Sequence, residues 1–291
     1  MSNMPRQSDV LGEYAPDRFM ITLSPDHPIV DPTTFKLLPL NDDTISVVFH
    51  EYSHYLQNIA TVAGYHSFRR SISLWRLFTE TVGPEGTSKG SDSLTPERSE
   101  WVAQYLAIAG RFDGDDEVNL PKTLKIQSFR ITGITRTPFE PRLGTGTVLL
   151  TQVILRGEVS GRTNAKMPFE YHFGTIAIME GLAHELDQIV AFGVDGRRTL
   201  KYVAPPFPYH ALRELVAYVL PGADPISILR LGCLSLMSND PAGALMDLCE
   251  LTAARISYGM PLAVAIDNVV ETCSERIEAL TDAVLAHDIP E

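Results

Sequence analysis

Two histidines and a glutamate stand close together in the segment His50-Glu51-Tyr52-Ser53-His54. Histidines four residues apart lie on one face of an α-helix, where both imidazoles can reach a single Zn²⁺ ion. The glutamate that follows the first histidine then lies beside the water that such an ion binds. This HExxH pattern predicts a hydrolytic metal site, with His50 and His54 as ligands and Glu51 as the general base.

The residues around the motif favour a helix. Asp42, Asp43 and Thr44 are typical of a helix N-terminus, and no proline or glycine follows until Gly64. Two histidines and a glutamate would be costly to bury in so apolar a segment unless they had a partner. A bound metal ion supplies that partner, so we interpret the segment as a metal-ligand helix.

A hydrolytic zinc site has three protein ligands and leaves one position for water, so a third ligand must come from elsewhere. Residues 175–190 form an otherwise apolar helical pattern that carries Glu180, His184 and Asp187 along one stripe. We predict Glu180 as the third ligand. His184 and Asp187 are then neighbouring groups that orient the ligands by hydrogen bonds. Glu185 and His184 stay open as alternative third ligands.

Small residues in the same segment suggest how the two helices meet. Gly181 and Ala183 would let the segment approach the helix of the HExxH motif closely. We therefore expect the two helices to pack side by side, with Gly181 facing the motif helix.

The HEYSH segment and the later segment Glu180-Gly-Leu-Ala-His184 together resemble the gluzincin branch of the zincin metallopeptidases. In that family an HExxH helix is completed by a glutamate from a downstream helix. The resemblance covers two short helices, and Glu180 lies much further from His54 than the few turns common in the family. It implies that His50, His54 and Glu180 hold Zn²⁺ and that Glu51 transfers a proton from the attacking water to the leaving amine.

Two further predictions concern the substrate. Tyr202, Tyr209 and His210 follow the predicted third ligand, and each is a candidate for stabilising the oxyanion of the reaction. By analogy, an edge strand at 147–156 or 167–173 could align an extended peptide by adding it to a sheet.

Composition limits the class of protein. The chain has 291 residues, 44% of them hydrophobic, and a formal net charge of −12. A sizeable core is therefore possible, and a nucleic-acid or anionic-membrane surface is disfavoured. The first residues lack the apolar stretch of a signal peptide, and Cys233, Cys249 and Cys273 show no metal or disulfide spacing. We expect a cytoplasmic protein with reduced thiols, no nucleic-acid partner and no membrane partner.

The hydrophobic pattern predicts a mainly helical α+β fold with a small antiparallel sheet. We expect a zincin-like metallopeptidase domain over 1–205, with both ligand helices, and a helical C-terminal lobe over 206–291 that closes over the metal cleft. Besides the two ligand helices, the expected helices are at about 67–82, 96–110, 209–220, 225–238, 241–257 and 262–287, and the expected strands are at 124–131, 147–156 and 167–173.

Two classes of function remain open. The first is a zinc-dependent endopeptidase that acts on a protein or peptide substrate, with or without an activating partner. The second is a catalytically silent zincin-fold protein that binds metal and serves regulation or interaction. The presence of Glu51 favours the enzyme, because a binding module needs ligands but no base. A di-iron site is disfavoured, because Glu180 and His184 are one residue too far apart for the second ExxH pair that it requires.

Overall fold

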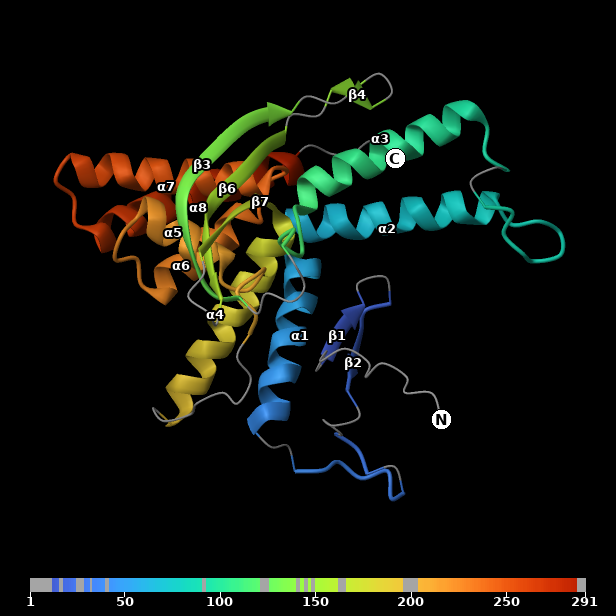
Figure 1. The fold of residues 1–291 in the computed structure, drawn as a ribbon, viewed down its shortest axis with the longest axis horizontal. Helices are drawn as coiled ribbons and strands as arrows, with labels where there is room; N and C mark the ends of the chain where they lie inside the picture. The colour runs from blue at the N-terminus through green and yellow to red at the C-terminus, as the bar shows by residue number, and fades with distance from the viewer. Residues whose placement is uncertain are drawn as a thin grey trace.

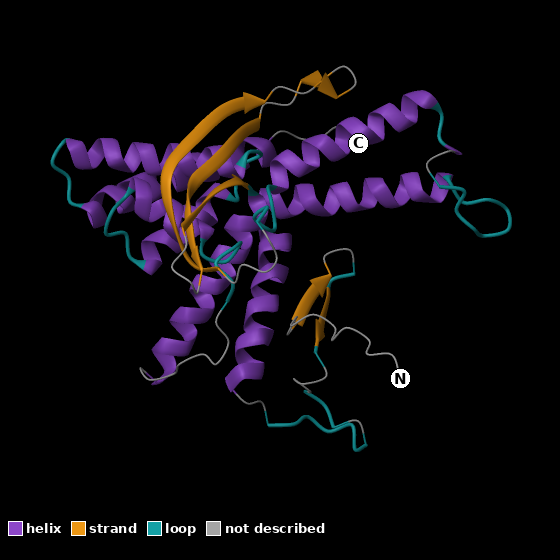
Figure 2. Ribbon diagram, in the orientation of Figure 1, coloured by secondary structure: helices purple, strands orange, loops and turns teal. Residues whose placement is uncertain are grey.

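The computed structural model shows a mainly helical molecule with one curved sheet (Figure 2). In the part of the chain that is described there are eight helices, and every strand pair is antiparallel. The predicted α+β class is confirmed. The described residues are 12–15, 18–24, 29–31, 33–39, 42–90, 93–120, 126–139, 142–143, 146–147, 150–161, 166–195 and 204–286.

The HExxH motif lies in the middle of helix α1 (Asp42–Ala60), and α2 (Val62–Glu80) follows after a sharp bend (Figure 1). Thr61 produces the bend because its side chain caps α2, accepting a hydrogen bond from the Gly64 amide at 2.9 Å. A Cβ atom at Gly64 would come within 2.4 Å of carbonyl oxygens at the end of α1. The cap also explains why α2 begins five residues before the position expected from the sequence.

Helix α4 (Thr175–Asp195) carries Glu180 and packs against α1, as predicted (Figure 1). The prediction that Gly181 faces α1 was wrong. A Cβ atom at Gly181 would lie 2.5 Å from the Cβ of Leu212, in helix α5 (Ala211–Val219). The small residue therefore permits close packing of α4 on α5, on another side of α4 from the ligand.

The main sheet has the strand order β3-β6-β7. It consists of β3 (Ile126–Phe139), β6 (Leu150–Gly161) and β7 (Lys166–Phe173), close to the three strands that the sequence predicted. A two-stranded extension pairs β4 (Arg142–Leu143) with β5 (Gly146–Thr147). The apolar face of the sheet is buried, with Val153, Leu155 and Tyr171 at most 1% exposed.

The C-terminal helices cover that face of the sheet. After α5 they are α6 (Pro225–Ser235), α7 (Pro241–Ser257) and α8 (Leu262–Ala286), and Asp224 and Asp240 cap the starts of α6 and α7. One apolar cluster joins buried residues from both sides of residue 205. The proposed division into two domains at that point stays a prediction.

Helices α2 and α3 (Pro96–Asp113) project from the body as an arm (Figure 1). Two ion pairs join them, Arg70 with Asp113 at 2.8 Å and Arg98 with Glu80 at 2.6 Å. No residue of α3 is fully buried among those described. The structure contains no helix, in its described part, that is long and apolar enough to cross a membrane.

A hairpin of β1 (Gly12–Ala15) and β2 (Met20–Leu23) lies against α1. Its contact is aromatic, because the ring of Tyr55 on α1 meets the rings of Tyr14 and Phe19 edge-on. The hydroxyl of Tyr14 also accepts a hydrogen bond from Asn58 Nδ2 at 3.0 Å. These contacts place β1 beside the HExxH motif.

Candidate metal centre

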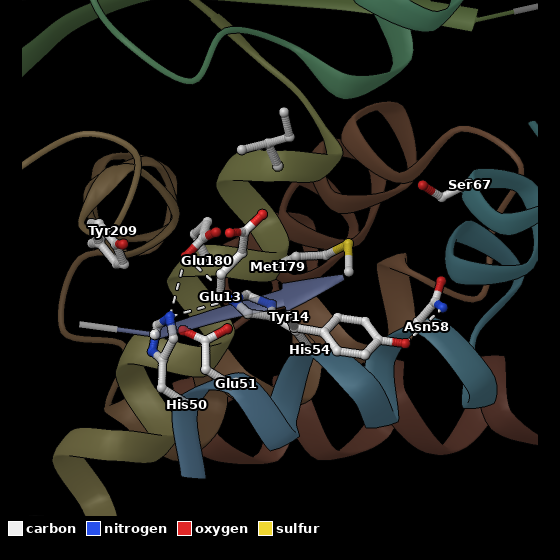
Figure 3. Close-up of a pocket in the computed structure, with 12 residues that line it drawn as sticks. Glu13, Tyr14, His50, Glu51, His54, Asn58, Ser67, Met179, Glu180 and Tyr209 are labelled. Atoms are coloured by element: carbon white, nitrogen blue, oxygen red, sulfur yellow. Dashed lines mark hydrogen bonds and ion pairs between the residues drawn. The ribbon is translucent and has the colours of Figure 1, made fainter. Parts of the chain in front are cut away.

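The side chains of His50, His54 and Glu180 converge on one point between α1 and α4 (Figure 3). Glu180 Oε2 lies 3.3 Å from His50 Nε2 and 3.4 Å from His54 Nε2, and the two nitrogens are 3.3 Å apart. Ligand atoms about 2.0–2.1 Å from a tetrahedral Zn²⁺ ion are about 3.3–3.4 Å from one another. The triangle of donor atoms therefore has the size that a zinc ion requires.

Gln57 determines which nitrogen of His54 faces this triangle. The amide nitrogen of Gln57 donates to the Met179 carbonyl on α4 at 3.0 Å, which leaves its Oε1 as the acceptor 2.9 Å from His54 Nδ1. Nδ1 must then carry the proton, so neutral His54 presents an unprotonated Nε2 to the site. Metal-bound histidines commonly have such a partner on their second nitrogen.

Glu180 and His54 each stabilise the charged form of the other. Burial acts to raise the pKa of Glu180, but hydrogen bonds that His50 and His54 donate from protonated Nε2 when no metal is bound outweigh it and lower the pKa to about 2. Burial acts to lower the pKa of His54, yet the hydrogen bond and charge of Glu180 raise it overall. Glu180 is thus held as a carboxylate, the form in which it can bind a cation.

Glu51 lies beside the triangle and is 7% exposed. Burial raises the pKa of Glu51 above its usual value, although the neighbouring His50 and His54 act against this. The Glu51 carboxylate accepts a hydrogen bond from the backbone amide of Tyr14 on β1. The approach is close, because a Cβ atom at Gly12 would lie 3.2 Å from Glu51 Oε1.

A cavity of about 280 Å³ opens over these groups. Its walls come from β1, α1, the start of α2, α4 and Tyr209, and Figure 3 shows the predicted ligands at one end of it. Among the described residues that line this cavity, none belongs to a strand of the main sheet. The analogy that placed an aligning strand at 147–156 or 167–173 therefore receives no support here, and β1 is the strand that borders the cavity.

The two groups predicted to orient the ligands have other partners. Asp187 Oδ1 accepts a hydrogen bond from Ser46 Oγ at 2.5 Å, which joins the start of α1 to α4. The ring of His184 contacts the rings of Tyr209 and His210, with centroids 6.0 and 4.8 Å away. Among the described residues, no hydrogen bond joins His184 or Asp187 to a predicted ligand. Their orienting role stays a prediction.

Glu185, an alternative third ligand, is engaged elsewhere. It is 1% exposed, and both of its oxygens accept hydrogen bonds from the Arg213 guanidinium, at 2.6 and 2.5 Å. This two-point ion pair ties α4 to α5. The other alternative, His184, has a pKa of about 3, because burial and the charges of His210 and Arg213 disfavour its protonated form. Neither belongs to the cluster that could hold a metal.

Of the three candidates for oxyanion stabilisation, Tyr209 lines the cavity, with its ring centroid 5.7 Å from that of His50. His210 lies behind it against His184. Burial lowers the pKa of His210, with a further contribution from Arg213. Tyr202 lies outside the described residues.

Sequence reasoning missed two contributors to the site. Gln57 lies on the same stripe as His50 and His54, so its position was visible, but its hydrogen bonds depend on the carbonyl of Met179 in a distant helix. The strand β1 was missed because no short-range pattern connects Tyr14 with Glu51.

In comparisons with known proteins, no family model, no curated protein and no solved structure matches the chain.

Proposed function

We propose that the protein is a zinc-dependent endopeptidase that hydrolyses peptide bonds of a protein substrate. The observation that carries this proposal is the triangle of His50 Nε2, His54 Nε2 and Glu180 Oε2, with sides of 3.3–3.4 Å, beside the buried carboxylate of Glu51. A base next to three metal-binding atoms is the arrangement that metal-assisted hydrolysis needs.

Zinc is the metal that this donor set favours. Two imidazole nitrogens and one carboxylate oxygen are typical of catalytic zinc sites, whereas magnesium and calcium prefer sites made of oxygen atoms. When bound, zinc polarises the scissile carbonyl and acidifies the attacking water. His50, His54 and Glu180 would hold it and leave one position open toward the cavity.

The remaining steps belong to the protein's own side chains. Glu51 removes a proton from the attacking water and later delivers it to the leaving amine. Burial raises the pKa of Glu51, which makes it a stronger base for accepting that proton. Tyr209, on the cavity wall near His50, is the described candidate for donating a hydrogen bond to the oxyanion.

The same geometry supports one other class of function. A metal-binding regulatory or interaction protein would also need the three ligands and the Gln57 contact, but it would not need Glu51. Burial of a carboxylate costs free energy, and the raised pKa of Glu51 shows that its hydrogen bond from the Tyr14 amide and the nearby histidines offset this cost only in part. The position of Glu51 at the cavity therefore favours the enzyme over the silent scaffold.

Glu51→Gln tests the proposal, because it keeps the size and shape of the side chain and removes only the base. We expect zinc content near that of the wild type and a loss of about 10²–10⁴ in the rate of hydrolysis. The substrate is first identified by incubating the protein with a cell lysate, with and without a chelator, and mapping the new N-termini.

His50→Ala is the companion variant, since it should lose both zinc and activity. Equal cleavage rates for Glu51→Gln and the wild type would exclude this mechanism. The wild-type protein could also bind zinc and yet cleave no substrate, even when lysate fractions are added to supply an activating partner. That result would favour the catalytically silent scaffold.

A further inference from the structure

The cavity extends well beyond the metal-binding atoms. Along α1 it is lined by His50, His54 and Asn58, each about one turn from the next, and it reaches Ser67 at the start of α2. Eight residues of α-helix span about 12 Å. Figure 3 shows Asn58 and Ser67 at the end opposite to His50. A substrate bound at the metal would therefore place one of its side chains along this extension.

The middle of the extension is apolar. Met179 lines it from α4, and the ring of Tyr14 lines it from β1 (Figure 3). Ile176 of α4 also lines the cavity. These groups suit the aliphatic stem of a side chain. A volume of about 280 Å³ for the whole cavity is just below the range of about 300–1,000 Å³ that is usual for small-molecule sites. The cavity therefore has room for a substrate side chain beside the predicted ligands.

The far end of the extension is polar. Asn58 is 4% exposed, and its Nδ2 donates to the Tyr14 hydroxyl at 3.0 Å. In the described part of the chain, no donor reaches the Asn58 amide oxygen, which points away from Tyr14 in Figure 3. The Tyr14 hydroxyl accepts from Asn58, so its own proton is left for another acceptor. The end of the cavity therefore offers an acceptor at Asn58 Oδ1 and a donor at the Tyr14 hydroxyl, in addition to the Ser67 hydroxyl and the second N–H of Asn58.

Charged substrate groups match this end poorly. Asn58, Ser67 and Tyr14 are uncharged at neutral pH, and the Arg70 guanidinium donates a hydrogen bond to Ser67 Oγ at 3.4 Å. That guanidinium would repel a cation. It is itself paired with Asp113 at 2.8 Å, so it offers little to an anion.

We propose that the end of the cavity formed by Asn58 and Tyr14 is a selectivity subsite for an uncharged side chain that ends in a carboxamide. Such a group presents a donor and an acceptor together, which matches the acceptor of Asn58 and the donor of Tyr14. Glutamine suits the subsite better than asparagine, because four residues of helix, about 6 Å along its axis, separate the level of His54 from that of Asn58. The proposal rests on the proposed function, since it assigns the side chain that accompanies the scissile bond.

The test uses peptide hydroxamates, which bind zinc directly and need no cleavage. Four compounds with one backbone carry glutamine, methionine, glutamate or lysine next to the hydroxamate, and their dissociation constants are measured with the zinc-loaded protein. The subsite predicts that the glutamine compound binds at least about tenfold more tightly than the methionine compound. That ratio reflects the loss of one buried hydrogen-bonding partner. Glutamate and lysine should bind more weakly than glutamine as well.

Variants assign the preference to the subsite. Asn58→Leu preserves much of the volume and should reduce the preference for glutamine over methionine to about twofold or less, with zinc content unchanged. Asn268→Leu, on α8, is the matched control and should keep the wild-type ratio. Tyr14→Phe removes only the hydroxyl and should also weaken the preference, so the test does not depend on the folding of one variant.

The outcomes separate this proposal from the proposed function. If all four hydroxamates bind with equal affinity, or if Asn58→Leu and Tyr14→Phe both keep the wild-type ratio, the subsite is refuted while the open metal centre stands. If no hydroxamate binds to zinc-loaded protein, the proposed function fails and the subsite fails with it.

Discussion

The imidazole of His54 has a partner at each ring nitrogen, and this makes its orientation the best-defined feature of the site. Nδ1 meets Gln57 Oε1, and Nε2 meets Glu180 Oε2 and His50 Nε2. Gln57 in turn is fixed by the Met179 carbonyl. The readiness of the site for metal thus depends on a side chain that would itself bind no metal.

Gln57→Leu should therefore weaken zinc binding without removing a ligand. Without the partner on Nδ1, the His54 ring can rotate and its proton can move to Nε2. The loss of such a hydrogen-bonding partner typically costs about 10–100-fold in metal affinity. Competition with a chromogenic chelator measures the affinity. Gln104→Leu, an exposed glutamine on α3, is the control and should bind zinc as the wild type does. Unchanged affinity in Gln57→Leu would show that Glu180 alone orients His54.

At the scale of elements, helix α4 contributes both to the candidate metal site and to the hydrophobic core. Its Glu180 faces α1, its Glu185 pairs with Arg213, and its Gly181 lies against Leu212 of α5. A helix with neighbours on several sides has little freedom to shift, which suits a helix that carries a predicted ligand. The close contact at Gly181 explains why a small residue is required there.

Gly181→Ala should destabilise the protein through this contact. The added Cβ would lie 2.5 Å from the Cβ of Leu212, which cannot move away by rotating its side chain. Overpacking of this kind typically costs about 1–3 kcal/mol. Gly110→Ala in α3 is the matched control, because its Cβ would meet nothing within 4 Å. That control should gain about 0.5–1 kcal/mol from helix propensity. Urea unfolding that shows equal stability for the two variants would contradict the packing.

An element can be predicted from the sequence when the residues that determine it are adjacent in the chain. The starts of α6 and α7 follow from Asp224-Pro225 and Asp240-Pro241, where cap and first turn are adjacent in the chain. The meeting of the HExxH helix with Glu180 followed from chemistry, because zinc needs a third ligand. The side on which Gly181 packs was mistaken, since a glycine in sequence shows that something comes close but not which helix it is. The place of β1 beside Glu51 depends wholly on tertiary contacts.

At the scale of the whole molecule, the candidate metal centre joins two groups of elements. Helix α1 contacts the β1–β2 hairpin and α2, whereas α4 contacts α5, α6 and α7. His50 and Glu180 are 130 residues apart in the chain, so the site forms only when both groups have folded. A bound zinc ion would stabilise the folded protein as a whole, because the unfolded chain offers no assembled site.

Removing the metal should therefore lower the melting temperature, and the size of the effect should depend on pH. A ligand at about 100 times its dissociation constant contributes about 2.7 kcal/mol. For a chain of 291 residues that corresponds to roughly 4–5 °C. We expect such a difference in melting temperature between zinc-loaded and metal-free protein at pH 7.5, measured by calorimetry. In the Glu180→Gln variant, added zinc should not change the melting temperature.

The difference should shrink as the pH falls from 7.5 to 5.5, for two reasons that act in the same direction. Zinc binds neutral imidazole, so protons compete with it. In the metal-free protein the pKa of His54 is raised above the value of 6.5 expected for the unfolded chain. Its protonation therefore adds stability that is present below about pH 6.5 and is lost as the pH rises through the folded-state pKa.

His184 provides the internal check on this comparison. Its pKa of about 3 lies below the unfolded value of 6.5, because burial and the nearby charges of His210 and Arg213 disfavour the proton. The stability that it contributes is complete above about pH 6.5 and is lost as the pH falls toward 3, with or without zinc. The contribution of His184 should thus lower the melting temperatures of both forms at pH 5.5, whereas protonation of His54 offsets this in the metal-free form alone, so the gap between the two forms narrows. A gap that stays constant or widens at pH 5.5 would show that the stabilising metal is not held by His50 and His54.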